Sequence, residues 1–266
     1  MREPRMISYA QQQEDVRLAR AFAGVSRGVY VDVGAHDDRA ASVTRHFYDA
    51  GWSGINVEPL ADRAERLRAA RPRDVTLAVA LSDREGEETL YELPRSPALS
   101  TLDAAAARAA AGSGAEVVER RVPVTTLAAV WAAHGGERCD FLKIDVEGHE
   151  AAVLRGANLT AFRPRVVLVE AVAPGSTRPT HAAWEPLLLA AGYVPAAFDG
   201  LNRYYVADDS ADLAPALAAP VTVLDDFEPW ELHRLRTENA ALRARLASLP
   251  HRAASALERL LGRRRP

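Results

Sequence analysis

The sequence predicts an α/β protein with a doubly wound, mostly parallel sheet, an antiparallel edge and a C-terminal helix. Three observations support this class: short apolar runs that read as buried strands, amphipathic helical segments between them, and two closing strand-like runs joined by a tight turn. Strands that alternate with helices, followed by a closing strand pair, imply a mostly parallel sheet with an antiparallel edge.

The chain opens on a predicted helix at residues 8–25, where apolar positions have helical spacing. The predicted strands that follow are short and are bounded by turn-forming or acidic residues. They are residues 29–33, 54–57, 75–81, 89–93, 117–124, 141–144, 165–169, 193–198 and 203–207. Helices fill the intervals, with Gly51, Pro72 and Gly192 as stop signals. They are residues 42–50, 60–70, 126–134, 150–155 and 182–191.

The bulk composition fits one globular α/β domain with short appendages. The 266 residues are 48% hydrophobic and 26% charged, and the net charge of −3 gives no reason to expect a nucleic-acid partner. Cys139 is the only cysteine, which excludes an internal disulfide and a cysteine-rich metal site. A polar N-terminus and the absence of an apolar run of about 20 residues lead us to expect a cytoplasmic protein without a membrane span.

We predict a main domain over residues 1–227 and a helical extension over residues 228–266. In the extension, leucines recur at alternating spacings of three and four, the pattern of a coiled-coil seam, and Asn239 occupies one a-type position. We expect residues 232–249 to form a homodimer, the alternative being a helix that packs on its own domain. The seam residues are Leu232, Leu235, Asn239, Leu242, Leu246 and Leu249.

A strand-to-helix turn at Asp32 and Gly34 lies where open α/β sheets bind ligands. Glu58 ends the next strand, at the spacing of a carboxylate that accepts hydrogen bonds from ribose hydroxyls. No further glycines follow Gly34 in the fingerprint of a dinucleotide site. Together these residues predict an adenosine-type cofactor.

A second polar group follows the strand at residues 141–144. Of the 33 basic residues, Lys143 is the only lysine, and it lies on the same strand face as Asp145. His149 enters the next helix, and Glu170 ends the following strand. We expect these residues to supply a base, hydroxyl acceptors or two carboxylates for a divalent ion, and we leave the metal open.

From residue 8 to about residue 227 the chain resembles the FkbM-type family of class I S-adenosylmethionine-dependent methyltransferases. The most specific segments are Glu58-Pro59 and the run Lys-Ile-Asp-Val-Glu-Gly that starts at Lys143. Many members read Gly-Ala-Asn-x-Gly at the first turn, where this chain has His36 and Asp38. The other supporting segments are 31–36, 51–57, 80–83, 100–102, 149–150 and 199–203.

The resemblance implies a seven-stranded, Rossmann-like sheet that binds S-adenosyl-L-methionine. The implied cofactor-binding residues are Asp32, Gly34, His36, Glu58, Ser82 and Asp83. Because the family typically methylates hydroxyls, we predict an O-methyltransferase for a sugar, glycan or natural-product acceptor. The predicted catalytic residues are Asp145, His149, Lys143 and Glu170, with Asp145 or His149 as the preferred base. The predicted substrate-binding residues are His181, Asp199, Asn202 and Arg203.

Two other classes of protein are alternatives to a methyltransferase. A degenerate fold of this kind could serve as a non-catalytic scaffold that partners a sugar-transfer enzyme through the C-terminal helix. Polar residues at every strand end argue against that scaffold. A nicotinamide-dependent oxidoreductase is disfavoured by the missing glycine fingerprint.

Overall fold

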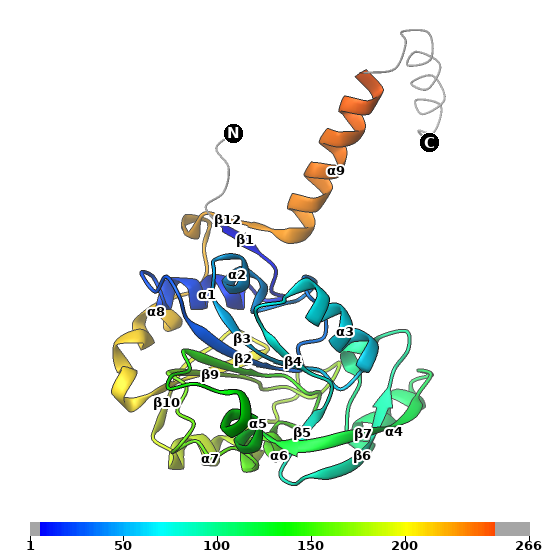
Figure 1. The fold of residues 1–266 in the computed structure, drawn as a ribbon, viewed down its shortest axis with the longest axis vertical. Helices are drawn as coiled ribbons and strands as arrows, with labels where there is room; N and C mark the ends of the chain where they lie inside the picture. The colour runs from blue at the N-terminus through cyan, green and yellow to red at the C-terminus, as the bar shows by residue number, and fades with distance from the viewer. Residues whose placement is uncertain (1–5, 248–266) are drawn as a thin grey trace. The chain divides into compact units, whose positions relative to one another are not determined.

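The structure is a computed structural model that describes residues 6–247, and these residues fall into two compact units (Figure 1). The larger unit, residues 9–225, holds the predicted sheet. In the smaller unit, strand β1 (Met6–Ser8) pairs in parallel with β12 (Phe227–Pro229), which leads into helix α9 (Trp230–Ala247). The predicted division placed residues 6–8 in the main domain. A three-residue strand whose partner lies more than 200 residues away has no periodicity that could reveal this pairing.

Seven strands form the central sheet, in the order β10-β11-β9-β8-β2-β3-β4. Neighbours from β9 to β4 run parallel, whereas β11 runs antiparallel to both β9 and β10. The predicted class, with its antiparallel edge, is therefore confirmed. The strands are β2 (Val29–Val33), β3 (Ser53–Val57), β4 (Val75–Leu77), β8 (Phe141–Ile144), β9 (Val166–Glu170), β10 (Tyr193–Phe198) and β11 (Asn202–Ala207).

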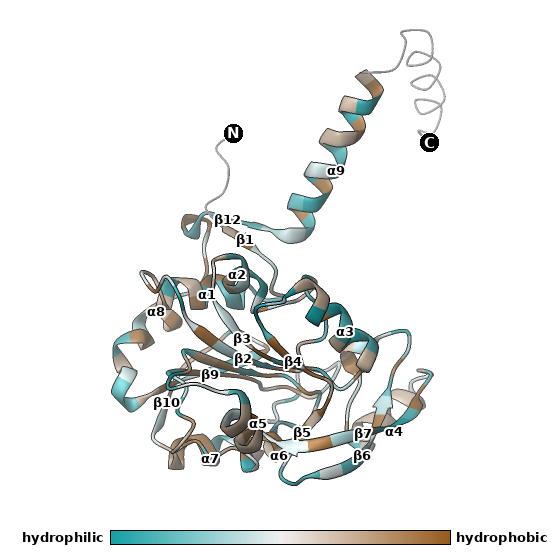
Figure 2. Cartoon of the chain, viewed as in Figure 1, coloured by the Kyte–Doolittle hydropathy of each residue, from teal (hydrophilic) through white to brown (hydrophobic). Residues whose placement is uncertain are grey.

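Helices cover both faces of this sheet (Figure 1). One face packs against α1 (Glu14–Ala21), α2 (Arg45–Asp49) and α8 (Ala214–Ala218). The other packs against α5 (Leu127–His134), α6 (Glu150–Arg155) and α7 (Glu185–Ala190). Figure 2 shows hydrophobic colour along the central strands and hydrophilic colour on α3 (Ala61–Ala70). Two apolar layers thus hold the strand ends in fixed positions at one edge of the sheet.

The expected strand at residues 75–81 is wrong, because it is two strands in two sheets. β4 ends at Leu77 and pairs with β3, while β5 (Ala80–Ser82) joins a second sheet in the order β5-β7-β6. Its partners are β6 (Gly86–Glu92) and β7 (Val118–Thr126). Apolar residues lie on both sides of the break, so hydropathy could not locate it.

The leading helix is also shorter than predicted, because α1 begins only at Glu14. Gln13 has left-handed backbone angles, with φ of 56°, and the Asp15 carboxylate accepts a hydrogen bond from the Tyr9 amide at 2.7 Å. That side chain folds the preceding residues back into a turn, as aspartate does near helix starts.

Helix α9 carries the predicted seam as far as Leu246, and Leu249 lies outside the described residues. Leu232, Leu235 and Leu242 are 41%, 54% and 57% exposed. Of the described helices, none has the length and apolar character needed to cross a bilayer.

Candidate active site

A cleft lies over the carboxyl ends of β2, β3 and β8, and encloses about 1060 Å³ including the solvent at its mouth. The predicted residues that line it are Asp32, Gly34, His36, Glu58, Lys143, Asp145, His149 and Asn202. The strand-end arrangement expected from the sequence therefore brings most of the predicted site together.

Gly34 fills a position that no other residue could take without a shift of the backbone. Its φ is 79°, and a Cβ placed there would lie 1.9 Å from the carbonyl oxygen of Asp145. The turn after β2 thus touches the end of β8, which joins the two predicted clusters. His36, two residues on, also has a positive φ of 51°, and its ring lies 3.2 Å from the Arg63 guanidinium.

Glu58 is buried at the end of β3 and spans the turn after β2. Its Oε2 accepts the His36 amide at 3.0 Å, and its Oε1 accepts the Leu60 amide at 2.9 Å. Burial raises the pKa of this carboxyl to about 7, against the lowering effect of those two hydrogen bonds. An ionised carboxylate has about four acceptor positions, so acceptor positions remain for ribose hydroxyls. Glu58 and the close approach at Gly34 fit an adenosine-type cofactor.

Lys143 is an ammonium held between two carboxylates. Its Nζ lies 3.3 Å from Asp32 Oδ1 and 3.4 Å from Asp145 Oδ2, and donates to the Gly34 carbonyl at 2.7 Å. Burial opposes the charge, but the two carboxylates outweigh it and raise the pKa of Lys143. The other oxygen of Asp32 accepts from Thr44 at 2.7 Å. Lys143 therefore stays protonated and positions Asp145, and Asp32 serves to hold Lys143.

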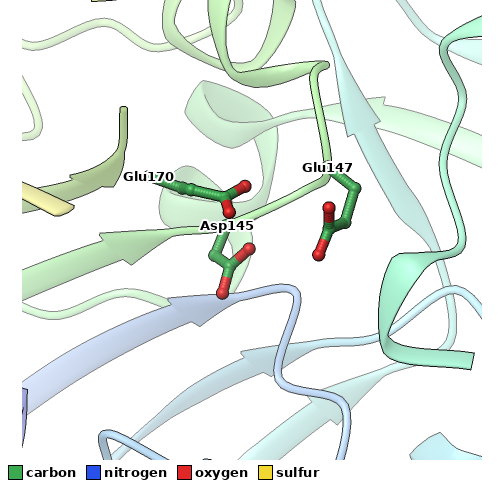
Figure 3. A group of neighbouring side chains, drawn as sticks. All are labelled: Asp145, Glu147 and Glu170. Carbon is green, nitrogen blue, oxygen red and sulfur yellow. The ribbon is translucent and has the colours of Figure 1, made fainter. Parts of the chain in front are cut away.

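Asp145 and Glu147 in the loop after β8 converge with Glu170 at the end of β9 (Figure 3). One oxygen of each carboxylate can be chosen so that all three lie within 4.8 Å of one another. Burial and the neighbouring acids raise the pKa of both Glu147 and Glu170. The predicted proximity of Asp145 and Glu170 follows from the direct pairing of β8 with β9.

His149 faces a different part of the cleft. Its Nε2 lies 3.0 Å from Ser82 Oγ, and burial lowers the pKa of its imidazole. The acidic groups that act on it most strongly are Glu88, Asp83 and Asp103. The ring nitrogen is thus paired with a hydroxyl on β5 and not with a carboxylate of the group around Asp145.

Some predicted residues lie outside the cleft lining. Asp83 forms an ion pair with Arg155 at 2.9 Å. Arg203 forms one with Glu185 at 3.3 Å, and His181 packs against the Trp184 ring. Of the four predicted substrate-binding residues, only Asn202 lines the cleft.

Asn202 is held in the cleft wall by its neighbours. Its amide Nδ2 donates to Glu14 Oε1 at 3.0 Å, and its backbone amide donates to Asp199 Oδ1 at 2.7 Å. Asp199 also accepts from the Tyr204 hydroxyl at 2.7 Å, so it acts within the turn between β10 and β11.

Sequence reasoning missed parts of the cleft wall. Gln11 and Glu14, near the start of α1, line it, as does the segment 97–102 before α4 (Ala104–Gly112). Thr101 Oγ1 donates to the Glu147 carbonyl at 2.7 Å and fixes that segment to the acidic loop. Glu147 belongs to the Lys-Ile-Asp-Val-Glu-Gly segment and could have been predicted as a site residue. Gln11 and Glu14 belong to no local sequence motif that indicates a site.

The fold and cleft define an α/β protein with a strand-end site for an adenosine-bearing cofactor. Residues 32–195 match the family model described as the methyltransferase FkbM domain, and the chain belongs to this family. It is a methyltransferase, and the family implies S-adenosylmethionine as the methyl donor. The scaffold and oxidoreductase alternatives are disfavoured by this membership.

Two solved structures show distant similarity. One is a TehB-like S-adenosylmethionine-dependent methyltransferase from Corynebacterium glutamicum, with 7% identity, a TM-score of 0.41 and coverage of 73% of this chain and 87% of that chain. The other is a fibrillarin/Nop5p complex, with 13% identity, a TM-score of 0.36 and coverage of 68% and 72%. No curated protein matches the chain in sequence.

Proposed function

We propose that this methyltransferase transfers the methyl group of S-adenosylmethionine to a hydroxyl of a sugar, glycan or natural product, with Asp145 as the base. The observation that carries the proposal is the position of Asp145. Its side chain is 35% exposed and lines the same cleft as Glu58, while Lys143 holds one of its oxygens at 3.4 Å. An exposed carboxylate in a cofactor cleft can meet an incoming hydroxyl.

When bound, the cofactor supplies a methyl group activated by a sulfonium. Glu58 would accept hydrogen bonds from the ribose, and the absence of a side chain at Gly34 lets the turn after β2 lie against the Asp145 carbonyl. Asp145 would take the proton of the acceptor hydroxyl as the oxygen forms its bond to the methyl carbon. The carbon–sulfur bond breaks in the same step, and its electron pair remains on sulfur as a neutral thioether.

The structure favours Asp145 over His149 as the base. Lys143 fixes the Asp145 carboxylate, whereas the His149 ring is paired with the Ser82 hydroxyl on β5. We assign His149, which lines the cleft and is paired with the Ser82 hydroxyl, to the cofactor end of the cleft.

A methyl-transfer screen tests this function. Labelled S-adenosylmethionine would be offered with sugars, glycosylated metabolites and, as a control, amine acceptors. We expect label on an oxygen atom, located by NMR of the product. Transfer only to nitrogen or carbon, or no detectable cofactor binding at millimolar concentration, would contradict the proposal.

A further inference from the structure

The proposed mechanism leaves two buried acids unused, Glu147 and Glu170. We infer that Asp145, Glu147 and Glu170 form a binding site for a hard divalent cation, such as Mg²⁺ or Mn²⁺, which holds the oxygen of the acceptor. The site itself stands on the geometry of the three carboxylates. Only its role toward the acceptor rests on the proposed function.

The spacing of the three carboxylates suits one ion. Their chosen oxygens lie within 4.8 Å of one another and come from three points of the chain that converge in Figure 3. Two ligands of one ion lie at most about 4.2 Å apart for Mg²⁺ and about 4.8 Å apart for Ca²⁺. Small side-chain adjustments would therefore complete the site. Oxygen-only donors select hard cations.

Buried oxygens without partners point to a missing ligand. Glu147 is 8% exposed and Glu170 is 6% exposed, and Oε2 of each has no hydrogen-bond partner among the described residues. A buried carboxylate is costly unless it is paired, protonated or bound to a metal. Figure 3 shows both carboxylates directed toward Asp145.

The ammonium group of Lys143 does not supply the missing partner of these two carboxylates. Lys143 is already shared by Asp32, Asp145 and the Gly34 carbonyl. With the charge of Lys143 balanced by Asp32, the three carboxylates carry three negative charges when ionised. A divalent ion would offset two of them.

The conformation of the loop after β8 fixes the position of Glu147. Glu147 has a φ of 55° and Gly148 a φ of 101°, which turn the chain back toward the strand ends. Glu150 Oε1 accepts the amides of Val146 at 3.2 Å and Gly148 at 2.9 Å. Thr101 fixes the loop from the opposite side at the Glu147 carbonyl. The acids are thus supported by neighbours that are not themselves ligands.

Three protein ligands would leave coordination positions for water and for the acceptor. A hydroxyl bound to such an ion loses its proton more readily, and its oxygen is fixed in direction. The site needs only one oxygen of Asp145 as a ligand, so the other oxygen would still take the acceptor proton and the proton balance given above is kept.

Titration of the chelator-treated full chain with Mn²⁺, with free Mn²⁺ followed by electron paramagnetic resonance, tests the site. We expect one bound ion per chain. Glu147→Gln and Glu170→Gln should each weaken binding by about tenfold or more, since each removes one charged ligand. The matched control is Glu119→Gln, on an exposed position of β7, which should bind like the natural chain.

Thermal unfolding supplies a second measurement. Mn²⁺ should raise the Tm of the natural chain and of Glu119→Gln, but not of Glu170→Gln. Without metal, Glu170→Gln should melt no lower than the natural chain, because the amide replaces a buried carboxyl whose Oε2 has no partner among the described residues. Absence of binding at millimolar Mn²⁺, or equal affinity in both cluster variants and the control, would overturn the inference. S-adenosylmethionine binding measured in parallel keeps this failure distinct from failure of the proposed function.

Discussion

At the scale of single residues, the only lysine of the chain joins the two halves of the site. Lys143 contacts Asp32 from the cofactor turn and Asp145 from the proposed base position, and it donates to the Gly34 carbonyl. An arginine has a planar fork in place of this compact ammonium, which helps to explain why lysine occurs here in an arginine-rich chain.

Lys143→Met should lower the free energy of unfolding by roughly 3–5 kcal/mol, because Asp32 would be left buried without its counter-charge. Equilibrium unfolding in urea measures this loss. The double variant Asp32→Asn/Lys143→Met is the control, and it should recover part of the lost stability. A loss below about 1 kcal/mol in the single variant would show that the pair does not hold the strand ends together.

Glu58 gives the cofactor site a pH dependence. Burial places the pKa of its carboxyl at about 7, so the ionised form, which we propose accepts the ribose hydroxyls, becomes dominant only above that pH. The affinity for S-adenosylmethionine should rise by about tenfold from about pH 6 to about pH 8. Calorimetry of the natural chain measures the rise, and Glu58→Gln should bind more weakly with a flatter pH profile. Equal affinity of the natural chain at both pH values would remove Glu58 from this role.

At the scale of elements, the strand ends could be predicted and the connections could not. Strands 29–33 and 141–144 match the observed bounds because apolar runs between polar residues are visible locally. The division of residues 75–82 between two sheets, and the pairing of β1 with β12, depend on partners distant in sequence. The same contrast applies to the site residues. Asp145 could be predicted because it follows a strand that is visible in the local sequence, whereas Gln11 could not be predicted.

The homodimer through α9 remains a prediction, and the exposed leucines of this helix support it. Leu235 is 54% exposed on a helix whose seam has a coiled-coil repeat. We propose that two copies of the chain pair through this seam. Leu235→Glu should then shift the mass measured by analytical ultracentrifugation toward the monomer, whereas Ala244→Glu, on the opposite side of the repeat, should not. A monomeric natural chain at micromolar concentration would contradict the pairing.

At the scale of the whole molecule, buried acids make stability depend on pH. Burial raises the pKa of Glu14 from 4.5 to about 7, so the folded chain holds this proton more tightly than the unfolded chain does. The stability that Glu14 contributes is present below about pH 4.5 and is lost as the pH rises through about 7.

The free energy of unfolding of Glu14→Gln, taken relative to that of the natural chain, should therefore increase by up to about 3 kcal/mol from about pH 5 to about pH 8. Urea unfolding at both pH values measures the gain, with Glu119→Gln as the exposed control. An equal difference between variant and natural chain at the two pH values would show that Glu14 does not titrate in this interval.

The central claim is that one cleft binds the methyl donor at Glu58 and removes the acceptor proton at Asp145. The most direct test is a paired measurement on Asp145→Asn, in which S-adenosylmethionine affinity and the single-turnover rate of methyl transfer are compared with those of the natural chain. We predict affinity within about twofold and a rate lowered by about 10²-fold or more, the usual contribution of a general base. A variant that transfers methyl groups at the natural rate would contradict the claim.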